Sequence, residues 1–424
     1  MPLSADPEER HRAPLIKQLG PGLIAGAADD DPSGIATYSQ AGAQFGYGLL
    51  WSVLFTTPLM IGIQIVSARI GRVTGHGLAA NIREHFPRPV LYFIVSLLLF
   101  ANTINIAADL GAMGDALVLV AGGNSSIYIV FFALLSLTLQ IFIPFPRYAP
   151  ILKVSTLALF AYFGTVLVVR MPLEALTQTL IPSLSSDKDY VAMLVAVLGT
   201  TISPYLFFWQ ASQEVEEQRA TPGHEPLREA PAQAREHLRR IKVDTYVGMI
   251  FSNAIALCIM LTTAATLHAA GVTRIESASQ AADALRPLAG DFAFMLFAAG
   301  IIGTGLLAVP VLAGSAAYAV AETFRWRIGL GLTLAEARGF YFILSAATIL
   351  GVAIDLSGVD SIKALIVAAI LNGIVSVPIM AILMLMAANP GVMGPFVARS
   401  RLKRLGWLAT GVMAVAVAAL FLLM

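Results

Sequence analysis

Long stretches without Asp, Glu, Lys or Arg constrain this chain more than any other feature of its sequence. A helix needs about 20 apolar residues to cross a bilayer, and several stretches reach that length. They include Pro32–Ala68, Ala116–Pro146, Tyr190–Gln213, Thr245–Thr273, Phe292–Ala321, Ala364–Ala398 and Leu405–Met424. Charged residues make up 12% of the chain, against about 25% in soluble domains. The sequence therefore predicts an all-α polytopic membrane protein.

The composition also excludes several classes of protein. A net charge of +1 gives no basic surface for nucleic acid, and 57% apolar residues are too many for a soluble enzyme. Cys258 is the single cysteine, so an intramolecular disulfide and a thiolate metal cage are both excluded. No HExxH helix, nucleophile elbow or phosphate-binding loop occurs in the sequence. We therefore expect no enzyme activity and no cofactor.

The uncharged stretches and their flanks predict eleven transmembrane helices. Their approximate ranges are 18–46, 49–68, 90–120, 126–143, 151–169, 190–213, 244–269, 291–321, 339–354, 362–388 and 405–424. The basic residues support this count, because cytoplasmic loops of membrane proteins are enriched in Lys and Arg. With the N-terminus inside, 22 of the 27 basic residues fall on the cytoplasmic side, and the exceptions are Arg170, Lys188, Arg274, Arg286 and Lys363. We expect a multi-pass protein of the cell membrane with a cytoplasmic N-terminus and an external C-terminus.

The same pattern predicts how the chain is organised. Residues 1–17 form a cytoplasmic segment, residues 18–388 form the helical membrane core, and residues 389–424 form a connecting loop and the eleventh helix. The one long polar loop is 214–242, which mixes Glu, Arg and Pro and is expected to contain a short helix near Ala232–Arg240. We interpret this loop as a solvated cytoplasmic connector.

The first and sixth predicted helices are interrupted. The first contains three successive acids, Asp29–Asp31, followed by Pro32, and the sixth contains Gly199 and Pro204. Proline removes a backbone donor, and glycine loosens a helix. A broken helix at membrane depth is tolerated where it lines a cavity, and its free carbonyls can bind an ion. Because the breaks lie five helices apart, they predict two inverted repeats whose breaks meet at the midplane.

The three acids admit two interpretations. Asp31 followed by Pro32 is a favourable helix start, because Asp is preferred as an N-cap and Pro at the first helical position. Three consecutive acids exceed what a cap requires, and ionisable residues inside a membrane are functional as a rule. We therefore expect Asp31 to bind a cation. Asp30 and Asp29 are weaker candidates, since neighbours on a helix point in different directions.

At these residues the chain resembles the NRAMP family of divalent-metal transporters. Gly20–Gly22 and Asp31–Thr37 are similar to the family's first-helix signature, GPG followed by DPGN and AT, and Gly199–Tyr205 is similar to GATVMPH. The eleven helices, the inside N-terminus and the paired breaks extend the resemblance over nearly the whole chain. It implies a LeuT-like fold with a 5+5 inverted repeat, broken helices 1 and 6, and helix 11 outside the repeat.

The resemblance also implies a metal site. Its ligands would be the carboxylate of Asp31 and the backbone carbonyls of Ala28 and Thr200. The family's tenth helix contributes an amide, which falls on Asn372 in this sequence. Asp30 is the further acidic candidate beside this set.

Several positions depart from the family pattern. The family's asparagine becomes Gly34 and its methionine becomes Ser203, while its sixth-helix histidine becomes Tyr205. A thioether is a soft ligand, whereas hydroxyl and water oxygens are hard. A roomier oxygen-lined site suits Mg²⁺, which gives up its waters reluctantly, and also admits Mn²⁺. The chain thus looks most like the NRAMP-related magnesium-transporter branch. The alternative is a proton-coupled Mn²⁺/Fe²⁺ symporter in which Ser203 only fills space.

Energy coupling follows from the same departures. A DLAE-like motif of the third helix appears as Asp109-Leu110-Gly111-Ala112, so the glutamate of the family's proton route is lost. Tyrosine is too weak an acid to replace the lost histidine as a proton carrier at neutral pH. We therefore expect weak or no proton coupling. The membrane potential can drive uptake instead, because 100 mV contributes about 4.6 kcal/mol for a divalent ion. Asp109 is a candidate for a proton or cation path, whereas Asn105 is expected to hold helices together.

A sodium-coupled amino-acid carrier of LeuT-like fold is a further alternative. An organic substrate would need an uncharged first break that leaves a helix N-terminus free for its carboxylate, and Asp29–Asp31 argue against this. We predict a facilitative transporter that carries divalent metal ions across the lipid bilayer by alternating access, with the metal as cargo. Nucleic acid is not expected as a partner. The sequence leaves the oligomeric state open and is compatible with a monomer.

Overall fold

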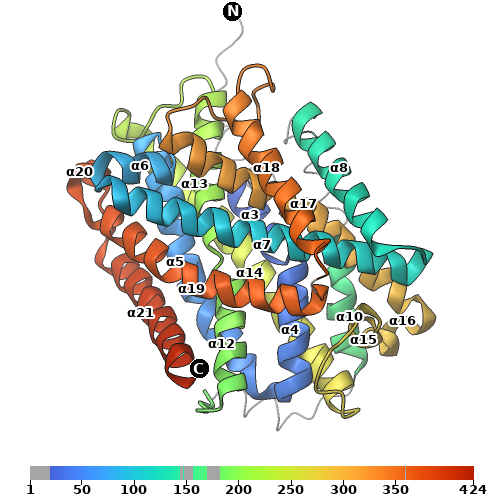
Figure 1. The fold of residues 1–424 in the computed structure, drawn as a ribbon. Coiled ribbons are helices and arrows are strands. Elements are labelled where there is room, and N and C mark those ends of the chain that lie inside the picture. Colours follow the sequence, from blue (N-terminus) through green and yellow to red (C-terminus); the bar gives the residue numbers. More distant parts are fainter. Residues whose placement is uncertain (1–19, 144–146, 148–155, 170–181, 359) are drawn as a thin grey trace, which may run out of the picture.

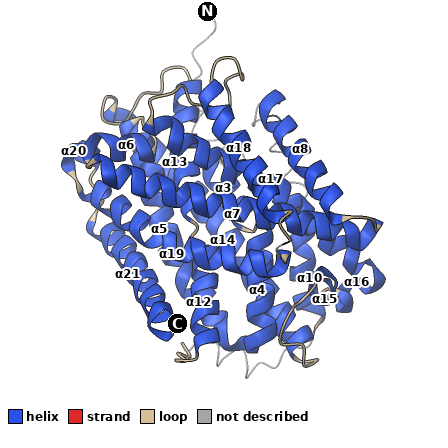
Figure 2. Ribbon diagram, in the orientation of Figure 1, coloured by secondary structure: helices blue, strands red, loops and turns tan. Residues whose placement is uncertain are grey.

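The protein is all-helical in the part of the chain that the structure describes. The computed structural model describes residues 20–143, 147, 156–169, 182–358 and 360–424. Within these ranges the chain forms helices joined by loops, and no strand occurs (Figure 2). Nine helical segments there are long and apolar enough to cross a membrane. The predicted polytopic helical architecture is therefore confirmed, while the count of eleven spans stays a prediction.

The helices of the first half follow the predicted order. They are α3 (Pro21–Asp29), α4 (Pro32–Phe45), η1 (Gly46–Leu49), α5 (Leu50–Thr74), α6 (Leu78–His85), α7 (Arg88–Ala121), α8 (Ser125–Phe142), η2 (Thr156–Leu159) and α10 (Phe160–Val168). The predicted segment 1–17 and the start of the predicted helix 151–169 lie outside the described residues.

The second half begins with another broken helix. Its elements are α12 (Lys188–Thr201), α13 (Pro204–Ala220), η3 (Pro231–Gln233), α14 (Ala234–Thr263), η4 (Ala264–His268), α15 (Ala278–Asp283), α16 (Arg286–Ala289), η5 (Gly290–Phe292), α17 (Ala293–Thr323), α18 (Arg338–Asp355), α19 (Ser361–Ala388), α20 (Pro390–Met393), η6 (Gly394–Phe396) and α21 (Ser400–Leu423). In Figure 1, α21 lies at the edge of the bundle, where it packs on α19 and α5.

The polar connector is shorter than the predicted loop 214–242. The helix α13 continues to Ala220, and the short helix predicted near Ala232–Arg240 is the first part of α14. Arg240 forms ion pairs with Glu214 and Glu217, both at 2.5 Å. These pairs allow charged residues to extend both helices beyond their apolar runs, which the hydropathy pattern alone does not indicate.

Close packing of α3 on α14 positions the first helix break. A Cβ atom on Gly26 would lie 2.2 Å from the carbonyl oxygen of Gly248, and one on Gly248 would lie 2.2 Å from that of Gly22. No side chain fits at such distances, so the two backbones are in direct contact. Small residues allow this close approach between helices in a membrane.

We predict that Gly248→Ala destabilises the protein. The added methyl group would overlap the backbone of α3, and overpacking of this kind costs about 1–3 kcal/mol. The matched control is Gly411→Ala in α21, where an added Cβ meets no atom within 4 Å. Thermal unfolding of the detergent-purified variants measures the difference. A Gly248→Ala protein as stable as the Gly411→Ala control would contradict the packing of α3 on α14.

Candidate metal site

Two helix breaks form the centre of the candidate site. The helix α3 ends at Asp29 and α4 begins at Pro32, while α12 ends at Thr201 and α13 begins at Pro204. In each case proline is the first residue of the second half, where its missing N–H leaves no intrahelical bond unmade. The predicted interruption of the first and sixth helices is thus confirmed.

Asp31 divides its carboxylate between two tasks. Its Oδ1 atom accepts a hydrogen bond from the backbone N–H of Gly34 at 2.7 Å and so caps α4. Its Oδ2 atom accepts a hydrogen bond from the side-chain amide of Asn105 on α7 at 3.1 Å. The helix-cap interpretation is therefore correct for one oxygen, and the second oxygen faces other helices.

Tyr205 connects the two breaks. Its hydroxyl group lies 2.9 Å from the carbonyl oxygen of Ala28 and 3.3 Å from Oδ2 of Asp31. A phenol carries a single proton, so it donates to one of these oxygens at a time. Ala28 and Asp31, which are both predicted ligands on the first helix, thus share one hydrogen-bond donor from the sixth helix.

Two asparagines extend the polar cluster toward α19. The Nδ2 atom of Asn372 lies 3.4 Å from Oδ1 of Asn105, which itself contacts Asp31. The Oδ1 atom of Asn372 is buried and has no hydrogen-bond donor among the described residues. An unpaired carbonyl oxygen in a buried position is a free ligand for a cation.

Thr200, Ser203 and Gly34 lie at the contact between the breaks. The hydroxyl of Ser203 lies 2.9 Å from the carbonyl oxygen of Thr200 and 3.1 Å from that of Gly199. A Cβ atom on Gly34 would lie 3.2 Å from the hydroxyl oxygen of Thr200, so the two broken helices approach closely here. The backbone carbonyl of Thr200, a predicted ligand, therefore accepts a hydrogen bond from Ser203 in this arrangement.

Asp29 and Asp30 face α14 and do not converge with Asp31. The hydroxyl of Ser252 lies 2.6 Å from Oδ2 of Asp29 and 3.3 Å from Oδ1 of Asp30. Across the described part of the chain, no three His, Cys, Asp or Glu side chains are arranged to hold a metal ion. A cation at this site must therefore be held by carbonyl, amide and water oxygens together with Asp31.

Asp109 is fully buried one helical turn after Asn105 on α7. Its carboxylate lies by the backbone N–H of Ser33 on α4, and its charge interacts with that of Asp31. Two carboxylates thus share one buried region. Cationic cargo or a proton would relieve their repulsion.

The site is closed in this structure. Asp31 is 2% exposed and Tyr205 is 0% exposed. On the side of α3, Asp244 of α14 accepts hydrogen bonds from the N–H groups of Gly20, Gly22 and Leu23 at 2.7–3.0 Å. A carboxylate is favourable at a helix N-terminus because it meets unpaired N–H groups and the positive end of the dipole. Asp244 therefore holds α3 against α14.

Comparison with known proteins places the chain in a family. A family model described as natural resistance-associated macrophage protein-like (Nramp) matches residues 22–423. The chain belongs to this family. Two proteins from strains of Klebsiella pneumoniae, both named divalent metal cation transporter MntH, are 27% identical over 395 and 400 residues. These matches cover 92% and 93% of this chain and 90% and 91% of the relatives.

Solved structures show the same fold. The crystal structure of the Eremococcus coleocola manganese transporter matches with a TM-score of 0.76 at 17% identity, covering 98% of this chain and 87% of that one. Mhp1, a nucleobase-cation-symport-1 family transporter, matches with a TM-score of 0.55 at 13% identity, covering 96% and 92%. These likenesses confirm the predicted LeuT-like fold class of this Nramp-family chain. The relatives are transporters, which agrees with the expectation that it is not an enzyme.

Sequence reasoning missed part of this Nramp-family site. Asn105 was expected only to hold helices together, yet it contacts both Asp31 and Asn372. Its position one turn before Asp109 places both on one face of the third helix, and this spacing could have indicated it. Ser252 lies more than 220 residues from the acids it contacts, and no sequence signal points to it.

We predict that Tyr205→Phe lowers the stability of the metal-free protein by about 1 kcal/mol or more, because a buried carbonyl and a buried carboxylate lose their shared donor. The control is Tyr92→Phe, which changes a phenol on a residue that is 48% exposed. Unfolding in detergent with a chelator present measures both variants. Equal stability of the two variants would show that the phenol does not connect the breaks.

Proposed function

We propose that this protein is a transporter of divalent metal cations that works by alternating access. The observation that carries the proposal is the contact of Tyr205 with both Ala28 and Asp31. Through this contact the second broken helix meets a backbone carbonyl of the first broken helix and its buried carboxylate. Paired half-helix ends at membrane depth are suited to hold an ion. The family and the relatives named divalent metal cation transporter support the same cargo.

The proposed ligands are all oxygen atoms. They are the carboxylate of Asp31, the backbone carbonyls of Ala28 and Thr200, the amide oxygen of Asn372, and water. Carboxylate, carbonyl and water oxygens suit Mg²⁺ and Mn²⁺, and no thioether is present at Ser203 to favour softer metals. The manganese transporter among the structural relatives supports Mn²⁺ as cargo, and the hard donor set extends the proposal to Mg²⁺.

Binding of the ion requires local rearrangement. A cation between Ala28 and Asp31 takes the place of the hydroxyl proton of Tyr205, so the phenol must turn away or offer its oxygen as a ligand. The carbonyl of Thr200 becomes available when Ser203 releases it. Both changes loosen the contact between the breaks, which connects ion binding to movement of α3 and α13.

Release toward the proposed cytoplasmic side requires α3 to leave α14. The bonds that resist this movement are those from Asp244 to the first N–H groups of α3. Arg240 next to it on α14 is held by Glu214 and Glu217 of α13. These contacts join α3, α13 and α14 at one end, so the two broken helices are released together.

The proposed transport admits two modes of energy coupling, which differ in whether protons move with the metal ion. In the first, the membrane potential drives uptake without protons, because Tyr205 stands where the family has a histidine. In the second, Asp109 accepts a proton when the ion reaches Asp31, as a symporter requires. The fully buried carboxylate of Asp109, whose charge interacts with that of Asp31, supports the second mode.

A sodium-coupled amino-acid carrier finds less support. The first break holds three acids, and Asp31 already occupies the N-terminus of α4 through the N–H of Gly34. A substrate carboxylate would meet repulsion there.

We predict that proteoliposomes containing the protein take up Mn²⁺ and Mg²⁺ when the interior is negative. Asp31→Asn, which keeps the shape of the side chain and removes its charge, should abolish uptake of both ions. Asp291→Asn, at an exposed position in η5, should transport like the wild type. Metal-sensitive dyes inside the vesicles report the flux. Uptake of Mn²⁺ without Mg²⁺ would contradict the magnesium part of the proposal, and full transport by Asp31→Asn would contradict the site.

We predict that Mn²⁺ uptake by the wild type leaves the internal pH unchanged if the potential alone drives it. A pH dye inside the same vesicles measures this. Acidification that accompanies Mn²⁺ uptake and disappears in Asp109→Asn would establish proton coupling through Asp109 and contradict the uncoupled mode.

A further inference from the structure

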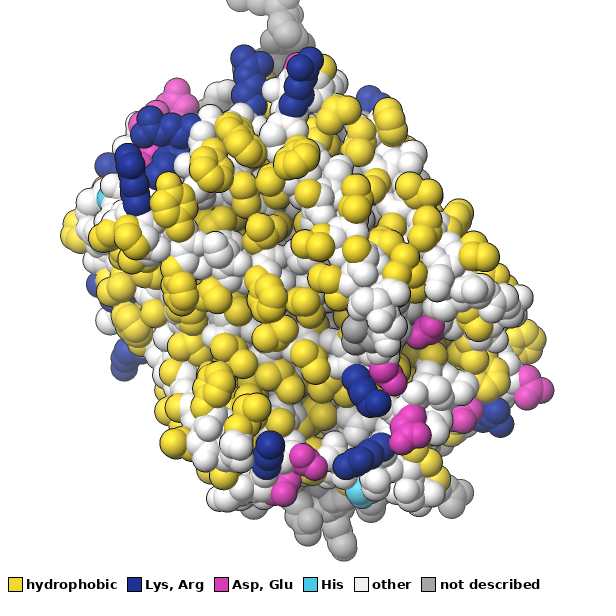
Figure 3. Space-filling view, in the orientation of Figure 1, with side chains coloured by type: hydrophobic (Ala, Val, Ile, Leu, Met, Phe, Trp, Pro, Cys, Tyr) yellow, Lys and Arg dark blue, Asp and Glu magenta, His cyan; other side chains and the backbone are white. Residues whose placement is uncertain are grey.

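A wide acidic cavity opens at the end of the molecule that the distribution of basic residues places outside the cell. Its volume is about 490 Å³, and it lies between α7, α8, the segment before α15 and the connection from α18 to α19. The acids that line it are Asp115, Glu276, Asp355 and Asp360. Figure 3 shows Asp and Glu side chains over this part of the surface, interspersed with Lys and Arg, and Asp360 is paired with Lys363 at 3.6 Å.

Asp355 is the acid in this cavity that is hardest to explain by folding alone. It is 8% exposed and is the last residue of α18. Its carboxylate has no hydrogen-bond donor or basic partner in the described ranges, and it interacts unfavourably with the charge of Asp115. A negative charge at a helix C-terminus also meets the negative end of the helix dipole. A cation would relieve all three costs.

The third helix has a gap that accommodates this carboxylate. A Cβ atom on Gly111 would lie 2.1 Å from Oδ1 of Asp355 and 2.9 Å from Oγ of Ser361. The absence of a side chain at Gly111 therefore lets Asp355 and Ser361 lie directly on the backbone of α7. Asp115, one turn further along α7, accepts a hydrogen bond from Ser125 at 2.6 Å and lines the same cavity.

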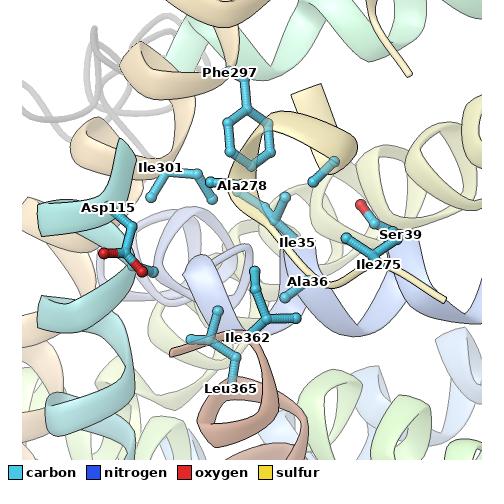
Figure 4. Close-up of a pocket in the computed structure, with 12 residues that line it drawn as sticks. Ile35, Ala36, Ser39, Asp115, Ile275, Ala278, Phe297, Ile301, Ile362 and Leu365 are labelled. Atoms are coloured by element: carbon cyan, nitrogen blue, oxygen red, sulfur yellow. The ribbon is translucent and has the colours of Figure 1, made fainter. Parts of the chain in front are cut away.

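A small pocket adjoins the acidic cavity and shares Asp115, Ala278 and Ile362 with it. It is lined by Asp115 at one end and by Ile35, Ala36 and Ser39 of α4, the helix that Asp31 caps (Figure 4). Its free space is about 20 Å³, which is enough for about one water molecule. The apolar side chains of Ile301 and Ile362 also line it. Asp115 borders both spaces, so an ion held there lies next to the small pocket beside α4.

We propose that Asp355, Asp115 and Ser361 form an outer binding station for a hydrated divalent cation, where the ion waits before it moves inward to Asp31. The proposal rests on the proposed function for its cargo. Two carboxylates and a hydroxyl are too few to replace the water shell of Mg²⁺ or Mn²⁺, which agrees with the absence of a three-acid metal group in the described residues. Carboxylates can instead bind such an ion through its waters.

The station explains a departure in the third-helix motif. Ala112 and Gly111 stand in the Asp109–Ala112 motif, so this part of α7 carries no glutamate. The carboxylate of Asp355 lies over Gly111 instead and comes from α18. Asp355 thus supplies the negative charge beside this part of α7, at a position that a hydrated ion can reach from the wide cavity.

Mn²⁺ uptake at increasing metal concentration tests the station through transport. Asp355→Asn removes the charge, and Gly111→Ala adds a methyl group that displaces the carboxylate. Both should raise the KM for Mn²⁺ about tenfold and leave the maximal rate close to that of the wild type. Tenfold is the lower end of the effect that a charged cleft has on the rate of ion capture. Asp291→Asn should leave KM unchanged. Wild-type KM values in both Asp355→Asn and Gly111→Ala would overturn the proposal.

Binding measured without transport separates the station from the proposed function. Binding is measured as the decrease of the free Mn²⁺ signal in electron paramagnetic resonance. The Asp31→Ala protein should still bind Mn²⁺ at one weak site. Adding Asp355→Asn should remove it, and adding Asp291→Asn should retain it. No binding by Asp31→Ala, or binding that Asp355→Asn does not change, would overturn the station. Failure of the wild type to transport Mn²⁺ would contradict the proposed function and leave this binding test valid.

Discussion

The structure depends on how a carboxylate is kept inside a charge-poor helical bundle. Asp31 is buried at a helix break, where one oxygen caps α4 and the other meets Asn105 and Tyr205. A buried charge needs compensation by hydrogen bonds or by a counter-ion. Here three helices, α4, α7 and α13, supply the donors, and each donor is a neutral group. In the proposed function, the remaining negative charge attracts the cation, and the neighbouring groups position the carboxylate.

The contacts around this carboxylate also couple its occupancy to the shape of the protein. Tyr205 belongs to α13 and Ala28 to α3, so an ion that displaces the phenol changes the contact between the two broken helices. At one end, Asp244 and the Arg240 ion pairs hold α3 to α14 and α13. At the other end, a small pocket with room for about one water molecule lies between α4 and the wide acidic cavity. In the proposed alternating-access cycle, this closed arrangement is the state between the two open ones.

The sequence predicted the fold well and the site in part, for physical reasons that individual residues make clear. Scarce charge and proline at positions 32 and 204 mark the spans and their breaks, because both are properties of the local sequence. Two other contacts join distant segments of the chain: Asp244 caps α3 from 222 residues away, and Asp355 lies over Gly111. No local sequence pattern encodes them. The lengths of α13 and α14 were underestimated because their charged ends are stabilised by each other.

The most direct test of the account is the position of Mn²⁺ in a crystal of the protein, located by its anomalous scattering. The account predicts the strongest signal among the Asp31 carboxylate and the carbonyl oxygens of Ala28 and Thr200, with Tyr205 turned from its present contacts. The signal should be lost in Asp31→Asn. A strongest Mn²⁺ signal whose ligands do not include Asp31 would contradict the account.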